Sequence, residues 1–225
     1  MLWRTERVYP AEPVLLTAPQ VEGLSRELGL VRREIGNYIL RLRAFLEQPP
    51  VQTDETLERF FAWAADGLGQ QAQPVRLTVA QMEELNESLA NMRHDINGQS
   101  SVVLAALELL KLRPGDRARH VARLVGVPVR MQTIMDDFCG KFAKTLAPEL
   151  LQSVAETVVE PMPRSESCPP EPRLSPGADD MAVLSRSPNA IKEFMTRFSL
   201  EFEKTLGITQ RPAGSSPFPG RSGGP

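Results

Sequence analysis

The sequence has little cysteine, few aromatic residues and no long apolar run. Only two of its 225 residues are cysteine, Cys139 and Cys168, which is too few for a disulfide framework or a cysteine-rich zinc site. We expect both to be free thiols. No stretch approaches the roughly 20 apolar residues that span a bilayer, and the first residues mix both charges, unlike a signal peptide. We therefore expect a cytoplasmic protein that does not enter a membrane.

An excess of charge of one sign is also missing. Lys and Arg number 26 against 28 Asp and Glu, which gives a net charge of -2 and a sequence pI of about 5.8. A nucleic-acid-binding protein needs a basic field or patch, and the sequence shows neither. We expect no nucleic-acid partner, and neither a metal ion nor a cofactor on this chain.

Strand-like alternation is absent, and helical periodicity takes its place. No segment alternates apolar and polar residues with β-branched side chains, so we expect no sheet. Apolar residues recur at steps of three and four instead. They predict four helices, which begin near Thr17, Thr53, Thr78 and Asp116. The first and third have the form of a capping box at their start, and Pro128 should bend the fourth.

The last third of the chain has a different composition. Seven prolines between Pro161 and Pro188 predict an extended linker. Ser187 and Pro188 have the form of an N-cap and a first-turn proline, and apolar residues recur on one face after them. We therefore expect a short C-terminal helix. From about residue 209, the content of Gly, Pro and Ser predicts disorder.

Two internal echoes relate different parts of the chain. The first aligns the first long helix with the third, so that Thr17 corresponds to Thr78, and the second aligns Phe138 with Phe198. Helical constraints alone can produce such matches. A real duplication would let two hairpins form a bundle within one chain. The phenylalanine stripe around Phe198 predicts packing on that bundle or on a partner.

These patterns divide the chain into six segments. We expect an all-α fold in which antiparallel helical hairpins form a four-helix bundle, either within one chain or across a homodimer. A Pro-rich linker and a short C-terminal helix follow the bundle. The segments are an N-terminal extension (1–16), a first helical hairpin (17–72), a second hairpin (73–150), the linker (151–188), the C-terminal amphipathic helix (189–208) and a disordered tail (209–225).

The third predicted helix carries a dense polar group around His94. With Leu89 and Ile96 at a positions of the heptad, His94 falls at f, on the side away from the core. A histidine ring is largely neutral at cellular pH, so one nitrogen has a lone pair available for attack. Asp95 can hold the other ring N–H and orient the ring. The pattern predicts an exposed nucleophilic histidine.

Gln99 and Asn97 complete this polar group. Gln99 follows Asp95 by one turn, where its amide can position a water for hydrolysis of a phosphoryl group. The same residue falls at a d position of the core seam, where a buried polar side chain sets helix register, and both interpretations stay open. His120 has no such neighbours, and we predict that it lies on the surface.

The segment from His94 to Gln99, together with the apolar run after it, resembles the H-box helix of sensor histidine kinases. The resemblance covers about residues 78–146 and implies a dimerisation and phosphoacceptor hairpin. In that family the histidine exchanges a phosphoryl group with an aspartate of a receiver domain. The resemblance therefore implies that His94 is the phosphoacceptor, and that Asp95 and Gln99 take part in dephosphorylation of the receiver. A response-regulator receiver domain, a histidine kinase donor and a second copy of the chain are the partners it implies.

The chain departs from that family in three ways. Gly98 stands where the more common branch has Thr or Asn four residues after the histidine, and a proline usual near that position is absent. We also expect no counterpart of the family's ATP-binding domain, because the part of the sequence after Leu146 is short and rich in proline. We expect no autonomous ATP-dependent kinase activity. In the first helix, Arg33 and Glu34 occupy the place of the histidine pair, so the first hairpin would be a non-catalytic copy.

Two functions remain open at this point. The first is a phosphotransfer or receiver-phosphatase module of two-component signalling, in which His94 exchanges a phosphoryl group with a response-regulator aspartate. The alternative is a non-catalytic dimerisation and interaction module, a degenerate kinase that binds a receiver domain or a kinase. Exposure of His94 beside Asp95 favours the first function, and burial of the ring favours the second.

Overall fold

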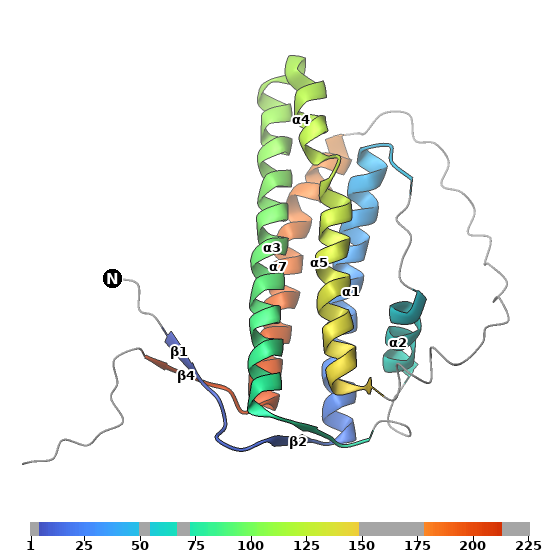
Figure 1. Cartoon of the computed structure of the whole chain (residues 1–225). Coiled ribbons are helices and arrows are strands. Elements are labelled where there is room, and N and C mark those ends of the chain that lie inside the picture. The colour runs from blue at the N-terminus through green and yellow to red at the C-terminus, as the bar shows by residue number, and fades with distance from the viewer. Residues whose placement is uncertain (1–4, 50–54, 67–72, 149–177, 213–225) are drawn as a thin grey trace, which may run out of the picture.

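The computed structural model describes residues 5–49, 55–66, 73–148 and 178–212, and most of them are helical (Figure 1). The expectation of a predominantly helical fold is confirmed. The helices are α1 (Ala18–Phe45), α2 (Glu55–Asp66), α3 (Val79–Leu112), α4 (Arg117–Leu124), α5 (Val127–Leu146) and α7 (Ala178–Thr205), with a short 3-10 turn at Pro114–Asp116. Within the described ranges, none of these helices is long and apolar enough to cross a bilayer.

Helices α1 and α3 begin at the predicted capping boxes. The backbone N–H of Thr78 donates to Oε1 of Gln81 at 2.9 Å, and the N–H of Gln81 donates to the Thr78 hydroxyl at 3.2 Å. At the start of α1, the N–H of Thr17 donates to Oε1 of Gln20 at 2.8 Å. These bonds satisfy amide groups that the first turn of a helix leaves without partners.

The long helices lie side by side and share one core. Helix α1 contacts α5 and α7, and α3 contacts the same two helices (Figure 1). The ring of Phe198 on α7 has its centroid 6.2 Å from those of both Phe138 and Phe142 on α5. All three side chains are fully buried. The phenylalanines of the second sequence echo therefore pack against one another, and α7 forms part of the core.

Two short antiparallel strand pairs show that the expectation of no sheet is wrong. Strand β1 (Thr5–Val8) pairs with β4 (Thr209–Pro212), and β2 (Val14–Leu16) pairs with β3 (Val75–Leu77). Strands of three or four residues are too short to produce the alternation on which a sequence prediction depends. Because β4 begins at Thr209, disorder from that residue onward is also wrong as far as Pro212. The rest of the predicted tail lies outside the described residues.

Strands β2 and β3 are related by an approximate two-fold axis. Leu15 lies opposite Arg76, and the residues on either side pair in reverse order. The first sequence echo, which aligns Thr17 with Thr78, makes Arg76 the counterpart of Leu15, so β2 pairs antiparallel with its own counterpart. The helix contacts follow the same relation, because α1 and α3 each contact α5 and α7. The first sequence echo thus corresponds to a relation in space.

Helix α7 is longer than predicted. It packs along α1, where the second helix of the predicted first hairpin was expected. It begins at Ala178 and has Pro188 inside it, so neither the helix start at Ser187 nor the linker boundary at 188 is correct. The hydroxyl of Ser187 bonds to the carbonyl oxygen of Val183 one turn earlier at 2.9 Å. Helix α2 is shorter than α7, and it packs on the outer side of α1 and α5. The long neighbours of α1 are α5 and α7.

The predicted fourth helix is in fact two helices. Helix α4 ends at Leu124, and α5 begins at Val127 after a break at Val125 and Gly126. Pro128 lies in the first turn of α5, where the missing N–H has no helical acceptor to lose. The proline therefore starts a helix instead of bending one.

Candidate functional site

His94 lies on the outer side of α3, as predicted. Met92 and Ile96 are buried in the core, whereas His94 is exposed. An α-helix turns by about 100° per residue, so a residue two positions from core residues on both sides points away from the core. The imidazole is therefore open to a partner molecule without any change in the packing of α3.

Asp95 lies in an acidic groove between α3 and α5. The groove has a volume of about 370 Å³, and the side chains that line it include Glu84, Glu87, Asp95, Asp137 and Lys141. Within the described part of the chain, no hydrogen bond joins Asp95 to His94. Consecutive helix residues do not face each other, so Asp95 lies toward α5 while the ring of the histidine points outward. The predicted orienting hydrogen bond is not made in this conformation.

Gln99 also lies on the α5 side of α3, but it is not in the core seam. Its Oε1 accepts a hydrogen bond from Nε of Arg130 on α5 at 3.1 Å. Ser100, which is 5% exposed, takes the buried position instead. Over the 34 residues of α3, a 3.6-residue helix drifts away from a strict heptad. At this turn Ser100 takes the core position that the heptad assigns to Gln99, so the predicted d placement of Gln99 is wrong. Val103, the next a position, is buried as the heptad predicts.

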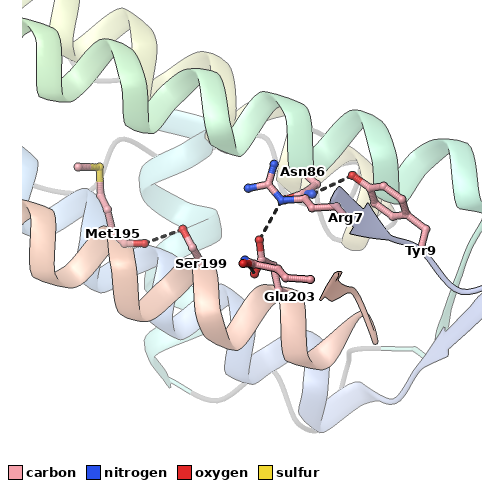
Figure 2. A network of polar contacts seen from close by, with 7 residues as sticks. Arg7, Tyr9, Asn86, Met195, Ser199 and Glu203 are labelled. Atoms are coloured by element: carbon pink, nitrogen blue, oxygen red, sulfur yellow. Dashed lines mark hydrogen bonds and ion pairs between the residues drawn. The ribbon is translucent and has the colours of Figure 1, made fainter. Parts of the chain in front are cut away.

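A polar network near one end of α3 and α7 identifies the face of α3 that meets α7 (Figure 2). Nδ2 of Asn86 donates to the Tyr9 hydroxyl at 2.8 Å. Beside this bond, Nε of Arg7 donates to Oε1 of Glu203 on α7 at 3.1 Å (Figure 2). Glu203 is 8% exposed and also accepts a hydrogen bond from Gln210 at 3.0 Å. Side chains of β1 and β4 thus bond to α7 at this end of the contact between α3 and α7.

Asn97 faces α7 and not the other candidate residues. It follows Asn86 by three helical turns, so the two asparagines lie on the same face of α3. Asp95 and Gln99 lie on the opposite, α5-facing side. The four predicted site residues are therefore close in sequence but divided over two grooves, with His94 on the ridge between them.

His120 is buried, and its predicted surface position is wrong. The residue is 5% exposed, and neither ring nitrogen has a hydrogen-bond partner among the described residues. Its neighbours Arg119 and Arg123 are exposed, which made the segment look uniformly polar. The buried face of α4 consists of His120 and Leu124, one turn apart, and α4 packs against α3. The four-residue spacing of His120 and Leu124, which places them on one face of a helix, was the sequence pattern that could have predicted this burial.

The sequence did not indicate an ion-pair cluster that forms around Arg32. Nη2 of Arg32 on α1 donates to Oε1 of Glu58 on α2 at 2.9 Å and lies 3.9 Å from Oδ1 of Asp136 on α5. The guanidinium carbon is 5.2 Å from the centroid of the Phe61 ring, a cation–π distance. A cavity of about 460 Å³ adjoins the cluster between α1, α2 and α5. Helix α2 is thus held over the groove between α1 and α5.

The thiols and possible metal ligands add no second reactive centre to the described part of the chain. Cys139 is fully buried and makes no disulfide, and burial raises the pKa of its thiol well above the usual range. Cys168 lies outside the described residues. Within them, no three His, Cys, Asp or Glu side chains gather in a way that could hold a metal ion.

The chemistry available at the site is therefore that of one accessible imidazole beside an acidic groove. A neutral ring nitrogen is a nucleophile, and the carboxylates at Asp95 and Asp137 favour positive charge near the groove. No family model matches the chain, and no curated protein or solved structure is detectably similar to it.

Proposed function

We propose that the chain is a phosphotransfer module of two-component signalling, in which His94 exchanges a phosphoryl group with the aspartate of a response-regulator receiver domain. The exposure of His94 midway along a long, packed helix is the observation that carries this proposal. A partner domain can reach the ring while the core face of α3 stays buried. The H-box resemblance of the surrounding residues supplies the identity of the transferred group.

The reaction is a direct transfer between two side chains. The lone pair of a ring nitrogen of His94 attacks the phosphorus of the receiver's aspartyl phosphate, and a nitrogen–phosphorus bond forms. The bond from phosphorus to the carboxylate oxygen breaks, and its electron pair leaves with the receiver's aspartate. Positive charge develops on the imidazole ring, and the nearby carboxylate of Asp95 stabilises it through space. No ATP-binding domain on this chain is needed for the step.

We further propose that α1, α3, α5 and α7 form a four-helix bundle within one cytoplasmic chain. The two-fold pairing of β2 with β3 and the matching contacts of α1 and α3 support this arrangement. Histidine kinase hairpins, which this segment resembles, form such a bundle from two chains. In a single-chain version only the α3 half carries the acceptor, because α1 has Arg33 at the equivalent position. Each chain would then accept one phosphoryl group.

A second candidate function is a non-catalytic interaction module that binds a receiver domain or a kinase. Two observations favour it. Asp95 makes no hydrogen bond to His94 in this conformation, and the amide oxygen of Gln99 is engaged by Arg130. The Asp95 carboxylate would have to turn toward the ring, and Gln99 would have to leave Arg130, before these groups could hydrogen-bond at the reacting centre.

Incubation of the purified full chain with phosphorylated receiver domains separates the two functions. We expect acid-labile, base-stable phosphate on the wild-type chain and none on the His94→Ala variant. Glu83→Ala provides a matched control, because it changes another exposed residue of α3 and should leave labelling intact. Circular dichroism checks that each variant keeps its helices. Stable binding of a receiver without labelling of His94 would favour the interaction module.

A further inference from the structure

The groove between α1 and α5 is covered in part by α2, which leaves a cavity of about 460 Å³ beneath it. Helix α2 lies over this groove, where Glu58 bonds to Arg32 and the Phe61 ring lies against Gly29. Leu57, Phe60 and Ala64 of α2 are buried. A short amphipathic helix with a carboxylate, and an aromatic residue three positions later, thus forms the cover of this groove.

The two-fold relation gives this groove a counterpart between α3 and α7. By the first sequence echo, Arg93 on α3 corresponds to Arg32 on α1. By the second, Thr196 on α7 corresponds to Asp136 on α5. The network in Figure 2 places Asn86 level with Glu203. Arg93 follows Asn86 by two helical turns on α3, and Thr196 precedes Glu203 by two turns on the antiparallel α7. Arg93 and Thr196 therefore lie at the same level.

Side chains that line the groove between α3 and α7 are more exposed than their counterparts beside α2. This difference is expected if no helix covers the second groove. Gln132 and Asp136, on the α2-facing side of α5, are half-buried. Their counterparts on α7, Lys192 and Thr196, are exposed. Leu200, one turn after Thr196, is 61% exposed, although it is a large apolar residue on a helix that packs in the core. Beyond the end covered by β1 and β4, the described residues place no helix over the groove between α3 and α7.

The charge of this uncovered groove is also unbalanced. Arg32, in the groove that α2 covers, is close to two carboxylates, Glu58 and Asp136. In the uncovered groove, threonine replaces the aspartate and Lys192 replaces Gln132. Among the described residues, no ion pair of Arg93 is present, and it lies one residue before His94. Among the described residues, this face therefore offers two cations without an ion pair, Arg93 and Lys192, near the exposed Leu200. The one carboxylate directly beside them in sequence is the exposed Glu193, so positive charge is in excess.

We propose that the groove between α3 and α7 binds an acidic amphipathic helix of a partner protein, in the way that the groove between α1 and α5 binds α2. A carboxylate of that helix pairs with Arg93 and Lys192, and an apolar or aromatic residue one turn later packs against Leu200. The bound helix lies next to His94. This interaction requires no phosphorylation of His94, so it holds for either candidate function.

The test uses a fluorescent peptide with the sequence of residues 55–66 as the acidic amphipathic probe, added to the full chain. Fluorescence anisotropy should show saturable binding of one peptide per chain. The double variant Arg93→Glu with Lys192→Glu should weaken binding at least about tenfold, because two favourable charge pairings become repulsive. Lys144→Glu makes a charge reversal of the same kind on the outer face of α5 and should leave the affinity unchanged.

A charge-swapped peptide makes the assignment specific. A probe with lysine in place of Glu58 should bind the wild-type chain weakly and regain affinity for the Arg93→Glu variant. The His94→Ala variant should bind the original peptide as the wild type does, which keeps this result separate from that of the labelling experiment. Absence of saturable binding, or binding that is equal in wild type and the Arg93→Glu variant, would overturn the proposal. The latter result would mean that the peptide displaces α2 from its own groove.

Discussion

The amide oxygen of Gln99 accepts a hydrogen bond from Nε of Arg130 at 3.1 Å, and this bond joins α3 to α5 beside the outward-facing His94. The oxygen that could orient a water toward a phosphoryl group is therefore engaged. Arg130 is exposed, so the bond can open without any disturbance of the core. Release of Gln99 is a small local change, and its consequences can be measured.

We predict that Arg130→Ala increases the rate at which the chain dephosphorylates a receiver domain. The substitution frees the Gln99 amide and removes only an exposed hydrogen bond, so the free energy of unfolding should fall by no more than about 1 kcal/mol. Release of inorganic phosphate from a phosphorylated receiver measures the rate. The double variant with Gln99→Ala is the control, and it should lose the gain. An equal gain in the double variant would show that Gln99 does not act on the water.

We predict that His120→Leu stabilises the protein. Both ring nitrogens of His120 are buried without partners in the described residues, and burial of unsatisfied polar groups costs about 1 to 3 kcal/mol. Leucine has a similar volume and no polar atoms, so the free energy of unfolding in urea should rise by about 1 kcal/mol. His120→Ala, which leaves a cavity, should lower it. A loss of stability in the leucine variant would indicate that a bound water satisfies the ring.

The long helices were predictable because the apolar pattern repeats over many residues in each of them. Thr78 with Gln81 marks the start of α3, and the apolar stripe then repeats over 34 residues. The exposure of His94 followed from that stripe, because the residue lies near its middle, where the phase is well determined. The burial of Ser100 in place of Gln99 was missed because a fixed heptad accumulates error along a straight helix.

Features that depend on distant parts of the chain were not predictable. Strands β1 and β4 lie at opposite ends of the described chain, and their short lengths carry no pattern of their own. Pro188 has an unfavourable effect on helix formation, and the packing of α7 against α1, α3 and α5 offsets it. His120 was misassigned for a related reason, since its burial depends on the way α4 packs against α3. Local propensity cannot report such contacts.

We predict that Phe198→Ala lowers the free energy of unfolding by about 3 to 5 kcal/mol, as expected for deletion of a fully buried aromatic ring. Phe198 contacts Phe138 and Phe142 of α5, so the cost measures how firmly α7 is part of the core. Leu200→Ala, on the same helix but 61% exposed, should cost less than about 0.5 kcal/mol. Equal effects of the two substitutions in urea unfolding would mean that α7 does not pack as described.

We predict that stability declines in alkaline solution, because of two buried acidic groups. Burial raises the pKa of the Cys139 thiol and of the Tyr38 hydroxyl above their usual ranges. In the unfolded chain a thiol ionises near about pH 8.5 and a tyrosine near about pH 10, whereas the folded chain keeps both protons. The folded state therefore binds more protons above about pH 8.5, and its free energy of unfolding falls as pH rises. Each group adds a slope of up to about 1.4 kcal/mol per pH unit.

Urea unfolding between pH 7 and 11 checks this prediction in a Cys168→Ser background, which leaves Cys139 as the single thiol. Cys139→Ala should remove the part of the slope that begins near about pH 8.5, and Tyr38→Phe should remove the part that begins near about pH 10. The slope is the decisive quantity, because a loss of packing lowers stability equally at every pH. The prediction fails if the curves of both variants run parallel to that of the background protein up to pH 11. The two groups would then ionise as readily in the folded state as in the unfolded one, and α1 and α5 would not shield them from water.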